Sequence, residues 1–133
     1  MQEENISNYI IDSSFILGYL LPDENVVHVD EVFKKYTQGT VSFFSSPLLP
    51  FEVVNGIKYA IVSKRIDNKK AHILIRDFSN VVITLEDVDF EEILEESLSK
   101  NLSVYDAPYL WLSHKKNFPL LTLDKRIQRL LKK

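Results

Sequence analysis

Short apolar runs and longer stretches with helical spacing alternate along this chain. The short runs, at 9–12, 41–44, 81–84 and 120–123, are rich in β-branched, aromatic and leucine residues and predict strands. The stretches between them carry apolar residues every three or four positions, which predicts helices. We expect helices over 13–21, 25–38 and 47–65, from 67, from the acidic run at 86–96, over 103–116 and from 125 onward. This alternation predicts an α/β fold with a central parallel sheet flanked by helices.

Residues with strong conformational preferences mark the expected ends of several helices. Gly39 is a suitable stop for the helix over 25–38, and Asp67 is suited to cap the helix that follows it. Pro47 and Pro50 fall in or near the first turn of the helix over 47–65, where proline is tolerated. That helix is expected to bury one apolar side, formed by Leu48, Phe51, Val54, Val62 and Ile66.

The size and composition are those of one globular domain. The chain has 133 residues, of which 45% are hydrophobic and 26% charged. We expect a single domain over 1–133, with 1–8 as a loose N-terminal extension. The acidic start lacks the features of a secretory signal, and the apolar run at 15–21 is far shorter than the roughly 20 residues that span a bilayer. We therefore expect a cytoplasmic protein without membrane contact.

Several kinds of active site are excluded or disfavoured by residue content. Since the chain has no cysteine, it has no disulfide, thiolate zinc site or cysteine nucleophile. Its three glycines form neither a dinucleotide-binding fingerprint nor a phosphate-binding loop. His28, His72 and His114 fall in three different predicted helices, so they do not indicate a shared general base. Carboxylates are left as the main candidates for chemistry.

The net charge of −3 conceals an uneven distribution. The run at 86–96 holds seven acidic residues and no basic one, so basic residues outnumber acidic ones in the rest of the chain. Two basic clusters are candidate surfaces for contact with nucleic-acid phosphates, and the alternative is that they are simply solvated helix faces. The clusters are Lys58, Lys64, Arg65, Lys69 and Lys70 and, near the end of the sequence, Lys125, Arg126, Arg129, Lys132 and Lys133. The candidate phosphate contacts within them are Lys58, Lys64, Arg65, Lys125, Arg126 and Arg129.

Four carboxylates occupy positions at which side chains meet in a parallel sheet. Asp12 and Asp124 each end a predicted strand, and ligands bind outside the carboxyl ends of such strands. Glu52 and Asp106 each stand at a predicted helix start among apolar neighbours. Taken singly, each of the four has a simple alternative role as a helix cap or as a partner of the helix dipole.

Taken together, four carboxylates at one edge of a sheet would repel one another unless a cation held them. Hard oxygen ligands favour Mg²⁺ or Mn²⁺. Such an ion can clamp a phosphodiester, lower the pKa of a bound water and stabilise the leaving oxygen. The sequence therefore indicates a Mg²⁺ or Mn²⁺ site that acts on phosphodiesters.

These residues resemble, in order and spacing, the PIN-domain ribonucleases, and within them the VapC toxins of toxin–antitoxin modules. The resemblance covers nearly the whole chain and is carried by four motifs together, since no single one is specific. In chain order they are Ile11-Asp12-Ser13-Ser14, Pro50-x-Glu52-x-x-Asn55, Ser103-x-Tyr105-Asp106-Ala107-x-Tyr109-Leu110 and Leu121-Thr122-x-Asp124.

The resemblance implies a three-layer α/β/α fold and an acidic quartet of Asp12, Glu52, Asp106 and Asp124 that holds one or two Mg²⁺ or Mn²⁺ ions. It places Ser13, Ser14 and Thr122 at the hydroxyl positions that orient these acids or a bound water. It implies hydrolysis of single-stranded or loop RNA. As partners it implies a cognate antitoxin protein and assembly as a homodimer or a toxin–antitoxin hetero-oligomer.

Two other classes of function compete with this interpretation. One is a non-catalytic PIN-like module that binds RNA or a partner, against which the intact acidic quartet argues. The other is a phosphoryl-accepting receiver or phosphatase, which also places aspartates at strand ends. Phosphatases of that kind have a second acid two residues after the first, where this chain has Ser14, and the paired acids of a receiver are missing.

Overall fold

The computed structural model describes residues 5–24 and 26–132. Its strands are β1 (Ser7–Ile11), β2 (Val41–Ser45), β3 (Ile83–Leu85) and β4 (Leu120–Leu121). Its helices are α1 (Ser13–Leu20), α2 (Val27–Thr37), α3 (Leu49–Val62), α4 (Asn68–Ser79), α5 (Phe90–Lys100), α6 (Ala107–Lys116) and α7 (Lys125–Leu131). The predicted sequence of alternating elements is confirmed.

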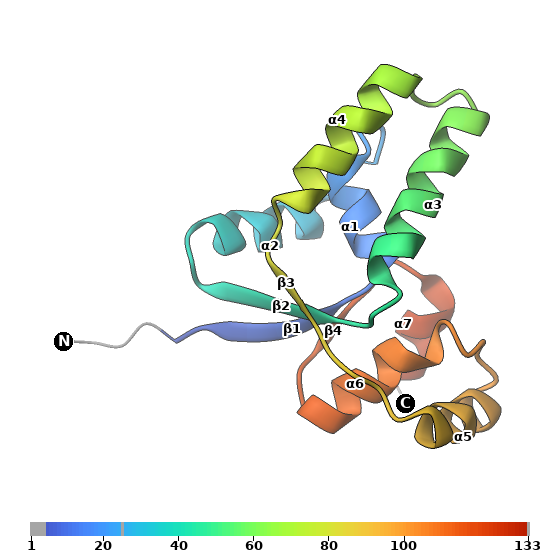
Figure 1. Cartoon of the computed structure of the whole chain (residues 1–133). Helices are drawn as coiled ribbons and strands as arrows, with labels where there is room; N and C mark the ends of the chain where they lie inside the picture. The colour runs from blue at the N-terminus through green and yellow to red at the C-terminus, as the bar shows by residue number, and fades with distance from the viewer. Residues whose placement is uncertain (1–4, 25, 133) are drawn as a thin grey trace.

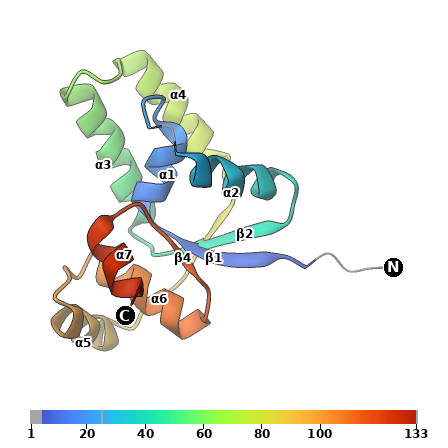
Figure 2. The ribbon, with the colours of Figure 1, turned by 180° about the vertical axis from the view of Figure 1, so that it is seen from behind.

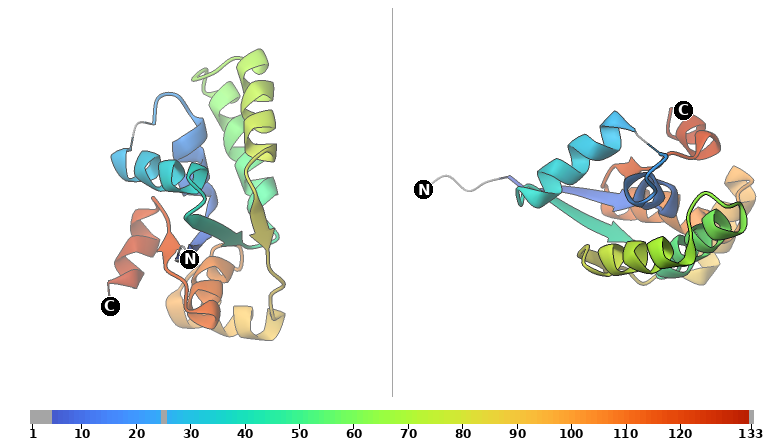
Figure 3. Two further views of the ribbon diagram at one scale, coloured as in Figure 1. Left: turned by 90° about the vertical axis from the view of Figure 1, so that its left-hand side faces the viewer. Right: turned by 90° about the horizontal axis from the view of Figure 1, so that it is seen from above.

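A four-stranded parallel sheet of order β3-β2-β1-β4 forms the middle layer. In Figure 1, α1 to α4 lie above this sheet and α5 to α7 lie below it, and the view from behind in Figure 2 shows the same division. Figure 3 shows that α3 and α4 form a hairpin that projects away from the sheet. The predicted three-layer α/β/α architecture is confirmed, and β1 is buried at its centre, with Ile10 and Ile11 fully enclosed.

The N-terminal extension is shorter than the sequence indicated. Residues 1–4 lie outside the described residues, but β1 begins at Ser7 rather than at Tyr9. Ser7 and Asn8 pair with Val41 and Ser42 of β2, and these backbone hydrogen bonds override the weak strand propensity of two polar side chains. The prediction of a loose segment over 1–8 is therefore wrong for Ser7 and Asn8.

Helix α6 begins four residues later than predicted. The sequence indicated a start at Ser103, whereas the helix starts at Ala107, and Pro108 explains the difference. Proline has no N–H group to donate back into a helix that started earlier, so it fits only in a first turn. Ser103 instead accepts a hydrogen bond from the N–H of Asp106 at 3.0 Å, which shapes the turn before α6.

The buried side of α3 also differs from the prediction. Phe51, Val54 and Val62 were expected in the core but are exposed, Phe51 to 76%. The residues that α3 buries are Leu49, Val53, Ile57 and Ala60. Because α3 carries apolar residues on more than one side, spacing alone does not identify the side that faces the sheet.

Candidate functional site

Two of the four predicted carboxylates follow the central strand and its neighbour. Asp12 comes directly after β1, and Asp124 follows β4 after a two-residue turn. The strands pair with Ile11 opposite Leu121, and the N–H of Asp12 donates to the carbonyl oxygen of Leu121 at 3.2 Å. The two aspartates therefore lie at the same edge of the sheet, as the sequence indicated.

Asp12 is a buried carboxylate at the start of α1, with only 3% of its surface exposed. Its Oδ1 atom accepts a hydrogen bond from the Ser14 hydroxyl at 2.6 Å and from the N–H of Phe15 at 3.1 Å. Burial raises the pKa of Asp12, and the nearby Asp124 charge adds to that increase. Hydrogen bonds from Ser14, Thr122 and Phe15 oppose it. Asp12 is thus both the cap of α1 and a buried carboxyl group whose ionised form is disfavoured by burial.

The hydroxyls of Ser14 and Thr122 join the ends of β1 and β4. They lie 3.4 Å apart, and Ser14 Oγ also accepts from the N–H of Leu123 at 2.8 Å. Thr122 Oγ1 accepts from the N–H of Asp124 at 3.0 Å, which turns the backbone and ends β4 at Leu121. These contacts fix the positions of both aspartates, whereas Ser13 instead lines an adjacent cavity.

Glu52 reaches the same region from α3. The hydroxyl of Tyr109, on α6, donates a short hydrogen bond to Glu52 Oε1. Burial raises the pKa of Glu52, the hydrogen bond from Tyr109 opposes this, and the charges of Asp106 and Asp12 add to the increase. Burial and the contact with Glu52 also raise the pKa of Tyr109, so its hydroxyl stays protonated and acts as a donor.

Tyr109 was not among the predicted site residues. The sequence does contain a signal for it, because Tyr109 stands three positions after Asp106 and residues with that spacing lie on the same side of a helix start. Tyr109 belongs to the motif at 103–110 that resembles the PIN-domain ribonucleases. A tyrosine among apolar residues, however, is by itself typical of a hydrophobic core. Its ring is indeed buried, at 1% exposure, and only the direction of its hydroxyl shows the second role.

Asp106 and Asp124 are joined by an arginine. Asp106 precedes α6 without capping it, and its Oδ2 atom lies 3.0 Å from Arg126 Nη2. The same nitrogen lies 3.4 Å from Asp124 Oδ2. Asp124 also caps α7, since its Oδ1 atom accepts from the N–H groups of Arg126 at 2.8 Å and Ile127 at 3.3 Å.

The four carboxylates form one electrostatic group. Asp124 raises the pKa of Asp12, and Asp106 and Asp12 raise the pKa of Glu52. The donor set, carboxylate and hydroxyl oxygens, suits a hard divalent cation. Within residues 5–24 and 26–132, however, no three carboxylates or histidines stand in positions that hold a metal ion together. The group therefore has oxygen donors of the kind that Mg²⁺ and Mn²⁺ prefer, in an arrangement in which Arg126 bridges Asp106 and Asp124.

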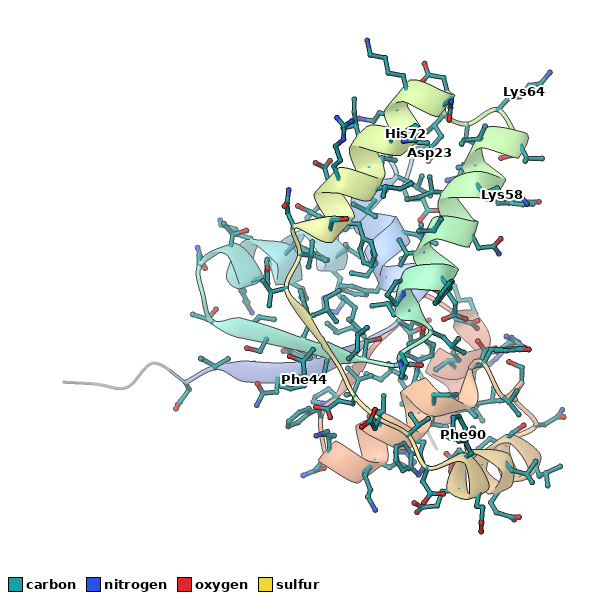
Figure 4. All side chains as sticks on the ribbon, viewed as in Figure 1. Asp23, Phe44, Lys58, Lys64, His72 and Phe90 are labelled. Atoms are coloured by element: carbon teal, nitrogen blue, oxygen red, sulfur yellow. The ribbon has the colours of Figure 1, made fainter. Side chains whose placement is uncertain are left out.

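The first basic cluster is divided by the structure. Lys58, on α3, lines a cavity of about 630 Å³ together with Ser13 and Glu52. Figure 4 shows Lys64 just after the C-terminal end of α3, well beyond Lys58. Arg65 is paired with Asp23 at 2.7 Å and Glu24 at 3.1 Å. Of Lys58, Lys64 and Arg65, Lys58 is the one that shares a cavity with a carboxylate of the group, Glu52.

The second basic cluster lies on α7. Arg126 belongs to the carboxylate group rather than to a free basic surface, which is a different role from the predicted phosphate contact. Lys125 and Arg129 are exposed, and no carboxylate of the described residues forms an ion pair with either.

This chain matches one protein family model and is similar in fold to solved structures. The family model for the PIN domain matches residues 9–133. The crystal structure of PAE2754 from Pyrobaculum aerophilum is similar with a TM-score of 0.69 and 20% identity, over 91% of this chain and 82% of that one. VapC20 of Mycobacterium tuberculosis, a toxin that cleaves the sarcin-ricin loop, is similar with a TM-score of 0.58 and 14% identity, over 92% and 94%. No curated protein sequence matches significantly.

Proposed function

Because this chain belongs to the PIN domain family, we propose that it is a Mg²⁺- or Mn²⁺-dependent endoribonuclease and the toxin of a type II toxin–antitoxin module. The observation that carries the proposal is a set of pairwise links among the four carboxylates. Asp12 and Asp124 follow the paired strands β1 and β4, Arg126 joins Asp124 to Asp106, and the charges of Asp12 and Asp106 act on Glu52. A toxin of similar fold, VapC20, supports the choice of RNA as substrate.

The bound ion would supply charge to stabilise a phosphodiester transition state and to acidify a water. The chain would supply the positions of the ligands. Ser14 holds the carboxylate of Asp12 at the start of α1, and Tyr109 holds that of Glu52. Ionised Asp12 is unfavourable in its buried position, so a divalent cation nearby would relieve a cost that the metal-free protein bears.

RNA would approach over the cavity beside Glu52. Lys58 offers a phosphate contact there, and the exposed ring of Tyr59 lines the same cavity. Aromatic rings bind unstacked bases, which fits single-stranded or loop RNA better than a duplex. We place the RNA along this side of α3 and exclude Lys64 and Arg65 from the contact.

We propose that an antitoxin segment would bind at an apolar surface beside α5. An apolar cavity of about 430 Å³ lies between α5 and the turn before α6, and Phe90, Leu94 and Tyr105 line it. The acidic residues of α5 line a separate cavity together with Trp111. Helix α5 thus contributes to one apolar and one acidic surface, which favours a partner segment with both apolar and basic side chains. Figure 4 shows Phe90 at the start of α5. A second copy of the chain is the other occupant to test.

The deciding experiment is cleavage of total cellular RNA by the purified protein with Mg²⁺ or Mn²⁺, with and without chelator. We expect Asp12→Ala, Asp106→Ala and the double variant to lose activity to the same low level, since ligands of one metal act as a unit. Asp87→Ala, at an exposed aspartate outside the cluster, is the matched control and should cleave like the parent.

Two results would contradict the proposal. Cleavage that persists in chelator would remove the metal from the mechanism. The parent protein could instead bind RNA without cleaving it, with equal affinity in the Asp12→Ala variant. That result would favour the non-catalytic binding module. Growth inhibition by the parent, relieved by co-expression of a neighbouring small protein, would test the toxin–antitoxin role separately.

The helices of the described residues are short or polar compared with a membrane span. No helix among them is both long and apolar enough to cross a bilayer.

A further inference from the structure

Arg126 is the counter-ion of two carboxylates of the proposed metal site. Its Nη2 atom lies 3.0 Å from Asp106 Oδ2 and 3.4 Å from Asp124 Oδ2. In the described part of the chain no other lysine or arginine forms an ion pair with Asp106, Asp124, Asp12 or Glu52. A single nitrogen, with one positive charge, therefore bridges two carboxylates that come from distant segments.

The fold anchors the backbone of Arg126 but leaves its side chain free to move. Asp124 caps α7 through the N–H groups of Arg126 and Ile127, and the side chain of Ile127 is buried. The Arg126 side chain is 60% exposed, and its hydrogen bonds through Nη2 go only to the two aspartates. It can thus leave the carboxylates without disturbing the core.

We propose that Arg126 is a built-in competitor of the metal ion, a cation that occupies Asp106 and Asp124 in the metal-free protein and is displaced when a divalent ion binds them. This inference rests on the proposed metal-dependent function. The physical reason is that Nη2 lies against both carboxylates, the groups that would also hold the metal ion. Two cations at the same carboxylates repel each other.

The strength of the interaction suits a competitor. An exposed ion pair is weak and is screened by salt, so a divalent ion can replace it. Arginine stays charged at all accessible pH values, so the competition does not depend on its protonation. Arg126 therefore sets the metal concentration at which the site fills, and it spares Asp106 and Asp124 mutual repulsion until then.

The first test is calorimetric titration of the purified full chain with Mn²⁺. We expect Arg126→Gln to bind Mn²⁺ about three- to tenfold more tightly than the parent, because one competing charge is gone. Arg126→Lys keeps the charge and should stay close to the parent. Arg129→Gln is the matched control, since it removes an exposed charge from the same helix without touching the carboxylates, and should leave the affinity unchanged.

The second test follows the Arg126 side chain directly. The Nε–H signals of arginine are recorded by NMR, and the one missing from Arg126→Gln is assigned to Arg126. We expect this signal to shift on titration with Mg²⁺, and to shift in chelator when Asp106→Asn removes one partner. Neither readout depends on RNA cleavage, and circular dichroism checks that each variant is folded.

The outcomes separate this inference from the proposed function. Equal Mn²⁺ affinity in the parent and Arg126→Gln, with an Arg126 signal that Mg²⁺ does not move, would overturn the competition and leave the metal nuclease intact. Failure of the parent and every variant to bind Mn²⁺ would overturn the metal-dependent function and this inference with it. Weaker binding by Arg126→Gln would reverse the role and make Arg126 a support of the metal site.

Discussion

The Tyr109 hydroxyl of α6 donates a hydrogen bond to the Glu52 carboxylate of α3, and so links helices from opposite faces of the sheet. The tyrosine ring is buried, which leaves the hydroxyl little freedom to turn elsewhere. This contact lowers the pKa of Glu52 against the opposite effect of burial. Tyr109 is therefore a positioning residue that holds Glu52 at the site and favours its ionised form.

Replacing Tyr109 with phenylalanine should impair activity more than stability. We expect RNA cleavage to fall about 10- to 100-fold, the usual effect of losing a group that orients a metal-binding side chain. The free energy of unfolding should fall by about 1–2 kcal/mol, the cost of one lost buried hydrogen bond. Cleavage assays and urea denaturation measure the two effects on the same preparation.

The pH profile distinguishes positioning from general damage. Without the Tyr109 hydroxyl the pKa of Glu52 rises further, so the acidic limb of the cleavage profile should move to higher pH. Tyr105→Phe is the control, because the Tyr105 side chain is exposed and forms no hydrogen bond to Glu52. An unmoved acidic limb in Tyr109→Phe would reduce Tyr109 to a packing residue.

Asp12 makes the metal-free protein less stable as the pH rises. Burial raises the pKa of Asp12 above its ordinary value of 3.8, so the folded state holds this proton to a higher pH than the unfolded chain does. As the pH passes from 3.8 through the raised value, the folded state comes to bear a buried charge and its stability declines. Asparagine carries no charge and is also a good helix cap.

We therefore predict that Asp12→Asn unfolds at higher urea concentration than the parent at pH 7 in chelator, by on the order of 1 kcal/mol. The difference should shrink as the pH falls towards and below 3.8, because Asp12 becomes protonated in both states only below its ordinary pKa. With saturating Mn²⁺ the order should reverse, since only the parent gains from the ion. A constant difference between pH 4 and pH 7 would show that the Asp12 charge is not its source.

Much of the fold was predictable because strands and helices differ in hydrophobic period. The four strands carry compact apolar runs, and their alternation with helices requires a parallel sheet. What spacing does not supply is the orientation of an element that is apolar on several sides. Helix α3 is the clear example, because Phe51 and Ile57 are both apolar, yet one is 76% exposed and the other 1%.

The site was predictable in part for a similar reason. Asp12 and Asp124 follow strands, so the sheet itself brings them together. The contacts of Arg126 and Tyr109 depend on side-chain direction across elements far apart in the sequence, which no local pattern encodes. The sequence of a basic cluster does not show whether its side chains contact RNA or acidic residues of the same chain. We propose the first for Lys58, and the structure shows the second for Arg65.

The corrected orientation of α3 gives a stability prediction. Ile57→Ala should lower the free energy of unfolding by about 2–5 kcal/mol, because it leaves a cavity between α3 and the core. Phe51→Ala should change it by less than about 0.5 kcal/mol, because the larger ring is already in water. Urea denaturation in chelator measures both. If Phe51→Ala lowered the free energy of unfolding more than Ile57→Ala, the buried side of α3 would be the one predicted from the sequence.

The last prediction concerns the RNA path. Lys58 shares a cavity with Glu52, whereas Lys64 lies just after the C-terminal end of α3 (Figure 4). A lysine that contacts a phosphate releases a counter-ion on binding, so its removal weakens binding at low salt and flattens the salt dependence. We expect Lys58→Gln to reduce the slope of log affinity against log salt by about 0.7, the value for one contact with single-stranded RNA. Lys64→Gln carries the same change in net charge and should retain the slope of the parent.

Measurements on the inactive Asp106→Ala background keep the RNA intact during fluorescence titration. Equal slopes for both lysine variants would mean that RNA does not cross this side of α3 and would move its path to α7, where Lys125 and Arg129 are exposed.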